Sequence, residues 1–224
     1  RVLFRSEYLV IPESNVWPLH EDIPSEIAAF FDPLGNAVHT ALAFNITGED
    51  ILICGAGPIG MMAAAICKFS GSRNIVVTDI NDYRLNLAKE LGASRTVNPR
   101  KEDIGTVFEE LGISHGFDVG LEMSGNPEAF NQMISLMYNG GNIALLGLLP
   151  NSTKVDWNKV IFKGLNIKGI YGREMYDTWY KMTQMIRSGL SVSKVLTHHF
   201  KIDDFQKAFK VIESGNCGKV VLEW

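Results

Sequence analysis

From Asp50 onward, short apolar runs rich in Val, Ile and Leu alternate with longer segments in which apolar residues recur at helical spacing. Short apolar runs are typical of buried strands, and their alternation with helices is typical of parallel βα units. Six parallel strands joined by right-handed crossovers predict a doubly wound α/β sheet of the Rossmann type. The predicted strands are Ile51 to Cys54, Asn74 to Thr78, Thr96 to Val97, Phe117 to Glu122, Asn142 to Leu146 and Asn166 to Tyr171.

Helical periodicity fills the segments between these strands. Glycines follow most of the helical segments, and a glycine just past the last periodic residue is a common helix stop. In a sheet of this kind, ligands bind at the carboxyl ends of the strands. The predicted helices are Ile59 to Phe69, Tyr83 to Leu91, Lys101 to Leu111 and Pro127 to Tyr138.

The flanking segments have a different pattern and predict the remnant of a second domain. Before the sheet lie an extended stretch, a proline-containing loop and two short helical patterns; after it lie a helix, a strand, a capped helix and a final strand. In chain order these are Glu7 to Ile11, Ile27 to Phe31, Leu34 to Phe44, Tyr176 to Arg187, Val195 to Ile202, Asp203 to Ser214 and Lys219 to Trp224. We therefore divide the chain into residues 1–48, 49–190 and 191–224. Residues 1–6 join awkwardly to the segment after them, and we expect them to be an end artefact.

Composition excludes several classes of partner. The chain has 224 residues, a formal net charge of −4 and no Lys- or Arg-rich run, so we expect neither nucleic acid nor an anionic membrane surface as a partner. The longest apolar stretch is broken by three glycines and a proline, which argues against a membrane span, and no signal peptide is evident. The three cysteines form no Cys-x-x-Cys pair, which favours a reducing, cytoplasmic location over a disulfide framework.

A glycine-rich turn comes after the first predicted strand and opens a predicted helix. Its sequence is Gly55-Ala56-Gly57-Pro58-Ile59-Gly60. In the dinucleotide-binding fingerprint the first glycine permits a tight turn, the second lets the backbone approach a pyrophosphate, and the third allows close packing of helix and strand. The helix N-terminus adds N–H groups and a positive dipole, and proline suits the first helical turn. The alternative is a glycine-rich turn that binds no ligand.

An acidic residue ends the second predicted strand at the distance expected for ribose recognition. Asp79 lies about 20 residues past the glycine turn, and its carboxylate can accept hydrogen bonds from both adenosine ribose hydroxyls. A 2′-phosphate would meet that charge, so NAD is favoured over NADP unless a cation compensates. Arg84 is such a cation, but packing on the adenine or pairing with Asp79 is the preferred interpretation. Alternatively, Asp79 is only a cap or turn former.

Turns at the carboxyl ends of later strands are candidates for contact with the nicotinamide half of the cofactor. They are Ser124-Gly125, Leu146-Gly147-Leu148 and Ile170-Tyr171-Gly172. Ordinary strand-terminating turns are an equally good interpretation.

Asp32 and the histidines carry less information. Asp32-Pro33 begins a helical pattern, which favours an N-cap Asp with proline at the first helical position. The other interpretation of Asp32 is a carboxylate near a catalytic site. The five histidines show no metal-ligand spacing and no Ser/His/Asp arrangement, so each is expected to be structural or on the surface.

Three segments resemble the zinc-dependent medium-chain alcohol dehydrogenases, and in particular the branch that oxidises threonine. They are Phe31 to Thr40, the glycine turn with its Pro58, and Phe162 to Arg173. The proline-containing glycine turn is shared across the family, whereas Ile170 to Met175 together with Trp179 to Met182 resembles the threonine-oxidising branch. The likeness runs from about Glu7 to Trp224.

The resemblance implies roles for individual residues. Ile59, Asp79 and Arg84 would contact the adenosine and pyrophosphate half of NAD, and Leu146 to Leu148 with Ile170-Tyr171 would flank the nicotinamide. Asp32 matches the carboxylate beside the catalytic zinc, where polyol-dehydrogenase relatives usually have Glu. The flanking segments would belong to a GroES-like catalytic domain. Both interpretations of Asp32 are compatible.

The chain also departs from the family pattern. The zinc ligands, the proton-relay residues and the four-cysteine zinc lobe of the family lie in an N-terminal portion that this sequence lacks, so zinc is expected only in a full-length enzyme. The resemblance then implies zinc-assisted oxidation of L-threonine by NAD in a homotetramer, with this chain inactive alone. The alternatives are a fragment of a polyol dehydrogenase acting on a sorbitol-like substrate, an inert NAD-binding module, and a chain that aggregates through its exposed apolar face.

Overall fold

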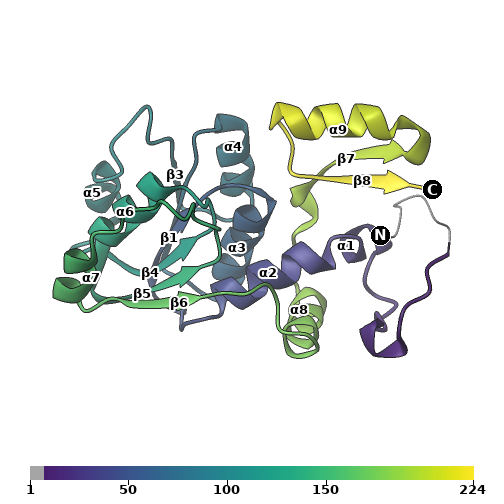
Figure 1. Cartoon of the computed structure of the whole chain (residues 1–224), viewed down its shortest axis with the longest axis horizontal. Helices are drawn as coiled ribbons and strands as arrows, with labels where there is room; N and C mark the ends of the chain where they lie inside the picture. Colours follow the sequence, from purple (N-terminus) through teal and green to yellow (C-terminus); the bar gives the residue numbers. More distant parts are fainter. Residues whose placement is uncertain (1–7) are drawn as a thin grey trace.

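The computed structural model describes residues 8–224 and is organised around one six-stranded parallel sheet (Figure 1). The strand order is β3-β2-β1-β4-β5-β6, which is the doubly wound Rossmann order predicted from the sequence. The strands β2 and β3 lie on one side of β1, and β4, β5 and β6 lie on the other, so the order of the strands switches between β1 and β4. Ligands are expected outside the carboxyl ends of these two strands. The strands are β1 Asp50–Cys54, β2 Asn74–Thr78, β3 Arg95–Val97, β4 Phe117–Glu122, β5 Met137–Leu145 and β6 Asn166–Gly169.

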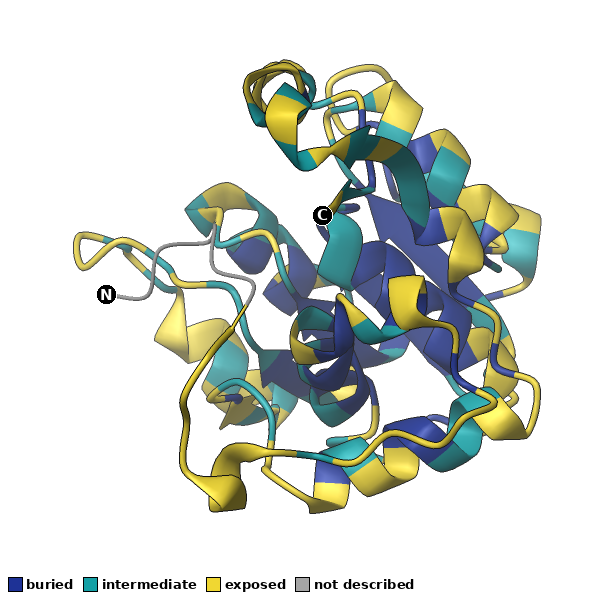
Figure 2. Cartoon of the chain, turned by 90° about the vertical axis from the view of Figure 1, so that its right-hand side faces the viewer, coloured by how far each residue is buried: buried dark blue, intermediate teal, exposed yellow. Residues whose placement is uncertain are grey.

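Helices cover both faces of the sheet and create two apolar cores. One core lies between the sheet and α2, α3, α4 and α8, and the other lies between the sheet and α5, α6 and α7. Figure 2 shows the buried residues gathered along the strands and the adjoining helix faces. The helices are α2 Phe31–Ala41, α3 Pro58–Phe69, α4 Asp82–Glu90, α5 Thr106–Leu111, α6 Pro127–Leu136, α7 Trp157–Lys163 and α8 Asp177–Arg187.

The central strand β1 shows why the apolar runs form this sheet. Every residue of β1 is buried, and its register joins β2 on one side and β4 on the other. A strand covered on both faces must be apolar almost throughout, unlike a strand with one solvated face. Ile51, Leu52 and Ile53 are fully buried, and each contributes roughly 1.5–3 kcal/mol through removal of its side chain from water.

The two flanks meet beside the sheet domain. The N-terminal flank has a short 3₁₀ turn, Glu13–Asn15, and the helix α1, Ser25–Ala28. At the other end, β7 (Leu196–Lys201) and β8 (Lys219–Glu223) form a separate two-stranded parallel sheet with α9 (Phe205–Ser214) packed on it. Figure 1 shows this unit on the α4 side of the sheet domain. None of the described helices combines the length and the apolar character needed to cross a membrane.

Several predicted boundaries were wrong. Strand β5 begins at Met137, inside the predicted helix Pro127 to Tyr138, because the chain pairs with Phe117 at once. Strand β6 ends at Gly169, and α5 covers only Thr106–Leu111 because residues 99–105 form turns. Residues 8–11 belong to no strand, and residues 1–6, expected to be an end artefact, lie outside the described part together with Glu7.

The helix α7 was missed, and the predicted start of α9 was two residues too early. Helix α7 is only seven residues long and none of its residues is buried, so its apolar residues give a short and weak pattern. Its signals are Asp156, whose side chain accepts from the Lys159 N–H, and the left-handed Gly164. Helix α9 was expected to run from Asp203 to Ser214 as a capped helix, and it ends as expected, with the left-handed Gly215 at its C-cap. A 3₁₀ turn at Ile202–Asp204 precedes it instead, and Asp204 at the N-cap makes no side-chain cap bond.

Candidate functional site

The glycine turn between β1 and α3 has the geometry that its sequence predicts. Gly55 has φ of +100°, a conformation that favours glycine. A Cβ at Gly60 would lie 1.9 Å from the Gly55 carbonyl oxygen, so only glycine lets α3 start this close to β1. A Cβ at Gly57 would meet no atom within 4 Å, and Gly57 is the N-cap of α3, with Pro58 directly after it. The space at this N-terminus is therefore open for an anion.

Asp79 lies directly against this turn. Its Oδ2 accepts a hydrogen bond of 2.7 Å from the Ala56 N–H, and its Oδ1 accepts one of 2.9 Å from the Asn81 N–H. The carboxylate is thus fixed beside the helix N-terminus that faces the open space. Its charge and remaining lone pairs suit the two hydroxyls of a ribose whose diphosphate lies at the N-terminus of α3.

Arg84 does not pair with Asp79, contrary to one part of the prediction. Its Nε donates to the Gly215 carbonyl at 3.0 Å, and Asn81 Nδ2 donates to the same oxygen at 3.2 Å. The guanidinium is therefore directed to the end of α9. Sequence separation of more than 130 residues hid this contact, because nothing in the local pattern links Arg84 to Gly215.

A cavity of about 430 Å³ adjoins Asp79 through the next residue, Ile80. Ile80 is largely exposed on one wall, and residues after β3 and β4 form the others. The lining residues are Ile80, Pro99, Arg100, Asn126, Glu128, Ala129 and Gln132. Sequence reasoning missed Pro99 and Arg100, because β3 is only three residues long and its end carries no motif.

The turns after β4 and β5 are held together by a buried carboxylate, Glu122, which the sequence did not single out. Glu122 is fully buried at the end of β4, and it accepts hydrogen bonds from the N–H and Oγ of Ser124 and from the N–H of Gly125. A Cβ at Gly147 would lie 2.2 Å from Glu122 Oε2, so Gly147 must be small. The Glu122 carboxylate therefore contacts both Ser124 and Gly147, two of the residues predicted to lie near the nicotinamide.

Burial raises the pKa of the Glu122 carboxyl above its ordinary 4.5, while the hydrogen bonds from Ser124 and Gly125 partly oppose this shift. A raised pKa in the folded state means that the contribution of Glu122 to stability is present below pH 4.5 and is lost as the pH rises through the folded pKa. We expect Glu122→Gln to lack this loss. Urea unfolding of both chains from about pH 4 to pH 7 measures the difference in slope.

The matched control is Glu109→Gln, which alters an exposed carboxylate on α5 and should keep the pH dependence of the unaltered chain. Identical pH slopes for Glu122→Gln and the unaltered chain would contradict a buried, titrating Glu122.

The other predicted nicotinamide residues differ in exposure. Ile170 is buried, and its N–H donates to the Leu145 carbonyl at 2.9 Å, which places it beside the end of β5. Leu146 is half-buried, whereas Leu148 and Tyr171 are almost fully exposed. Leu146, Gly147 and Ile170 therefore lie at the carboxyl edge of the sheet, and the side chains of Leu148 and Tyr171 extend away from the core.

Asp32 is not a helix cap. Helix α2 begins at Phe31, its N-cap is Phe30 without a side-chain cap bond, and Asp32 lies within the first turn. Its carboxylate forms an ion pair with Arg173, whose guanidinium also lies 5.0 Å from the Trp179 ring centroid. The cap was predicted because Asp before Pro is a common start signal, but the strong tertiary partner decides the position of the carboxylate.

The buried cysteines and the possible metal-ligand residues form no further site in the described residues. Burial raises the pKa values of the Cys54 and Cys67 thiols to about 12, so neither is a thiolate nucleophile at neutral pH. No group of three or more His, Cys, Asp or Glu residues in the described part of the chain is arranged to bind a metal ion. These residues therefore do not fit a zinc site.

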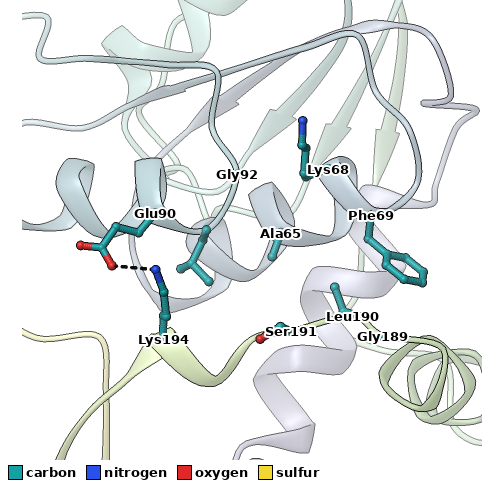
Figure 3. A pocket seen from close by; sticks show the side chains of 10 residues that line it. Ala65, Lys68, Phe69, Glu90, Gly92, Gly189, Leu190, Ser191 and Lys194 are labelled. Carbon is teal, nitrogen blue, oxygen red and sulfur yellow. Dashed lines mark ion pairs between the residues drawn. The ribbon is translucent and has the colours of Figure 1, made fainter.

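A separate cavity of about 460 Å³ lies between the C-terminal ends of α3 and α4 and residues 189–194 (Figure 3). The ion pair between Glu90 and Lys194, with 3.2 Å between Oε2 and Nζ, crosses its rim. Because Ala65 and Phe69 line this cavity while the glycine turn is at the other end of α3, about 15 Å away, the cavity is distinct from the space at the glycine turn.

Comparison with known proteins agrees with this geometry. The family of zinc-binding dehydrogenases matches residues 58–188, which is more than half of the chain. The L-threonine 3-dehydrogenases of Chromobacterium violaceum and Stenotrophomonas maltophilia are each 60% identical over 219 residues. These matches include 98% of this chain and 64% of each relative, so the chain spans about 64% of the length of the curated relatives it matches.

Solved structures show the same fold. An alcohol dehydrogenase from Escherichia coli CFT073, complexed with NADH, is 25% identical with a TM-score of 0.86; the match covers 96% of this chain and 64% of that one. Galactitol-1-phosphate dehydrogenase from Escherichia coli is 26% identical with a TM-score of 0.84, covering 97% and 66%. With the Rossmann order, the glycine turn and the matched residues together, the chain belongs to the zinc-binding dehydrogenase family.

Proposed function

We propose that this chain supplies the NAD-binding part of an enzyme that oxidises L-threonine to 2-amino-3-oxobutanoate. The observation that carries the proposal is the Asp79 carboxylate, fixed by the Ala56 N–H beside the open N-terminus of α3. That arrangement suits a diphosphate and an unphosphorylated ribose, which favours NAD over NADP. The names of the relatives, L-threonine 3-dehydrogenases at 60% identity, support threonine as the substrate.

The reaction balances with NAD⁺ as the hydride acceptor. With NAD⁺ bound, the C3–H bond of threonine would break with its electron pair passing to the cofactor, and the hydroxyl proton would be released as C3 becomes a carbonyl carbon. Bound NAD supplies the acceptor carbon. The residues of this chain bind and orient: the N-terminus of α3 takes the diphosphate, Asp79 takes the ribose, and the turns supported by Glu122 place the nicotinamide half.

Asp32 is the candidate for proton movement at the substrate. The Asp32 side chain is 63% exposed despite its ion pair with Arg173, so its carboxylate is open to solvent. We propose that its carboxylate assists release of the hydroxyl proton, with Arg173 setting its orientation. The described residues offer zinc no set of ligands. We propose that zinc would be held by residues of the full-length enzyme outside this part of the chain, where it would polarise the C3 hydroxyl of the substrate.

The domain division and the assembly are also proposals. Residues 1–48 and 191–224 would belong to the GroES-like catalytic domain, and residues 49–190 to the NAD-binding domain. Contacts between residues 81–84 and Gly215 support an arrangement in which the two domains meet at the ribose site. A cytoplasmic homotetramer is the expected assembly, and light scattering of the purified protein measures its mass.

Calorimetry with the chain of residues 1–224 tests the dinucleotide site directly. We expect NAD⁺ to bind in about the micromolar range and NADP⁺ to bind at least about tenfold more weakly, because a 2′-phosphate would meet the Asp79 charge. Absence of binding for both would contradict the proposed function at its base. Threonine-dependent NADH formation by this chain alone would contradict the expectation that the chain is inactive by itself.

Substrate identity needs the longer protein. When the matching full-length enzyme is supplied with zinc and NAD⁺, threonine should be oxidised much faster than sorbitol. The reverse order would favour the polyol dehydrogenase alternative. An inert NAD-binding module remains the second candidate, favoured by the lack of any three-ligand metal group in residues 8–224.

A further inference from the structure

A polar stripe on α2 faces the loop between β6 and α8. Asp32, Asn36 and His39 lie four and three residues apart, which places them on one side of the helix. Gly35 lies beside them, and a Cβ there would be 3.1 Å from Arg173 Cδ and 3.2 Å from Trp179 Nε1. The loop and α8 therefore pack closely on this side of α2.

His39 provides the link nearest the centre of the loop. Its Nδ1 lies 2.8 Å from the carbonyl oxygen of Gly172, 133 residues away in sequence. A carbonyl oxygen can only accept, so Nδ1 is the donor. The His39 side chain is 15% exposed, and its Nε2 lies 3.6 Å from Glu174 Oε1. The imidazole is thus largely enclosed against the loop, although the sequence predicted only a structural or surface histidine.

The loop depends on α2 for its position. In the described part of the chain, α2 provides the hydrogen bond and the ion pair of residues 171–173, His39 with Gly172 and Asp32 with Arg173, while the Arg173 guanidinium also lies over the Trp179 ring of α8. Gly172 has φ of +58°, so the backbone turns sharply at the residue whose carbonyl His39 holds. On the other side, Ile170 is anchored to the Leu145 carbonyl at the carboxyl edge of the sheet.

This loop borders the proposed nicotinamide site at one end and carries the partner of Asp32 at the other. Loss of the His39 contact would leave Gly172 with no described hydrogen bond while Ile170 stayed anchored. The segment Tyr171–Arg173 would then move relative to both the sheet edge and Asp32.

We propose that His39 is a positioning residue, whose ring holds the Gly172 carbonyl and thereby places the 170–174 loop against the nicotinamide half of bound NAD. This inference rests on the proposed NAD site. It predicts that His39 acts on the nicotinamide half and not on the adenosine half, which is bound by the glycine turn and Asp79.

The test compares NAD⁺ with ADP-ribose, which lacks the nicotinamide, by calorimetry on the chain of residues 1–224. In His39→Leu, affinity for NAD⁺ should fall about tenfold, the equivalent of one net hydrogen bond, while affinity for ADP-ribose should stay within about twofold. Asn places its amide nitrogen where Nδ1 lies, whereas Gln reaches the position of Nε2. His39→Asn should therefore retain NAD⁺ affinity, and His39→Gln should behave like His39→Leu.

Amide hydrogen exchange gives a second readout that needs no ligand. Peptides covering residues 170–176 should exchange faster in His39→Leu and His39→Gln than in His39→Asn, with no change in peptides covering residues 50–60. His115→Leu is the control, since His115 is exposed and lies beside Tyr138, with 6.0 Å between ring centroids, far from this loop in the fold.

Three results would overturn the inference. One is an equal loss of NAD⁺ and ADP-ribose affinity, which would mean a general structural role. Another is equal affinity of the unaltered chain for the two ligands, and the third is rescue by Gln but not by Asn. Failure of the unaltered chain to bind ADP-ribose would instead refute the proposed NAD site.

Discussion

Gly60→Ala should destabilise the chain by more than about 3 kcal/mol, while Gly57→Ala should leave its stability almost unchanged and remove NAD binding. The reason is the difference in their surroundings. A Cβ at position 60 would lie 1.9 Å from the Gly55 carbonyl oxygen, which is backbone and cannot rotate away, whereas a Cβ at position 57 would meet nothing within 4 Å. Helix α3 would have to move away from β1 in the first variant only.

The open space at Gly57 gives the second half of this prediction. If a diphosphate fills that space, a methyl group there will compete with it, even though the ligand-free chain accommodates the methyl group. Urea unfolding measures the stability of both variants, and calorimetry measures their affinity for NAD⁺. Full NAD⁺ affinity in Gly57→Ala would show that the diphosphate lies elsewhere, and normal stability in Gly60→Ala would show that the turn is not packed as described.

Asp79→Asn should weaken NAD⁺ binding by about ten- to a hundredfold and reduce the preference for NAD⁺ over NADP⁺. The substitution preserves size but removes the charge that strengthens hydrogen bonds to the ribose hydroxyls, and a hydrogen bond to a charged group contributes about 1.5–3 kcal/mol. NADP⁺ should lose much less affinity, because the repulsion between its 2′-phosphate and the carboxylate disappears. Calorimetric titration with both dinucleotides measures the two changes.

Asp82→Asn is the matched control for Asp79→Asn. Asp82 is in the first turn of α4, three residues away, and its carboxylate binds Lys101 and accepts 2.8 Å from Asn98 Nδ2. Its replacement should affect stability more than dinucleotide binding. Parallel losses of NAD⁺ and NADP⁺ affinity in Asp79→Asn, or similar losses in Asp82→Asn, would contradict the assignment of Asp79 to the ribose.

The parts of the fold that the sequence predicted were those in which local pattern and tertiary burial agree. The strands β1, β2 and β4 are covered on both faces; β1 and β2 have continuous apolar runs, β4 is mostly buried, and the predicted bounds of all three were nearly correct. The glycine turn and Asp79 were also predictable, because their roles depend on backbone geometry at a fixed spacing. The short strand β3 was also predicted, because its apolar residue lies between a helix that ends at a glycine and a turn.

The parts that could not be predicted depend on contacts between residues far apart in the chain. Asp32 was assigned to a cap because its partner, Arg173, lies 141 positions later and no local feature indicates it. Glu122 was overlooked because a carboxylate at the end of an apolar strand gives no sign that three donors will surround it. His39 gave no signal because its role is defined by Gly172.

The two hydrogen bonds from Asn81 and Arg84 to the Gly215 carbonyl connect the start of α4, in the sheet domain, to the end of α9, in the C-terminal segment. Gly215 has φ of +74° at the end of α9, and a Cβ there would lie 3.2 Å from Asn81 Nδ2, so the last helix cannot turn about its axis without displacing the start of α4. A rotation of residues 196–223 relative to the sheet domain would therefore displace Asn81, and through it Asp79, whose carboxylate accepts from the Asn81 N–H. A ribose bound to Asp79 would oppose that rotation.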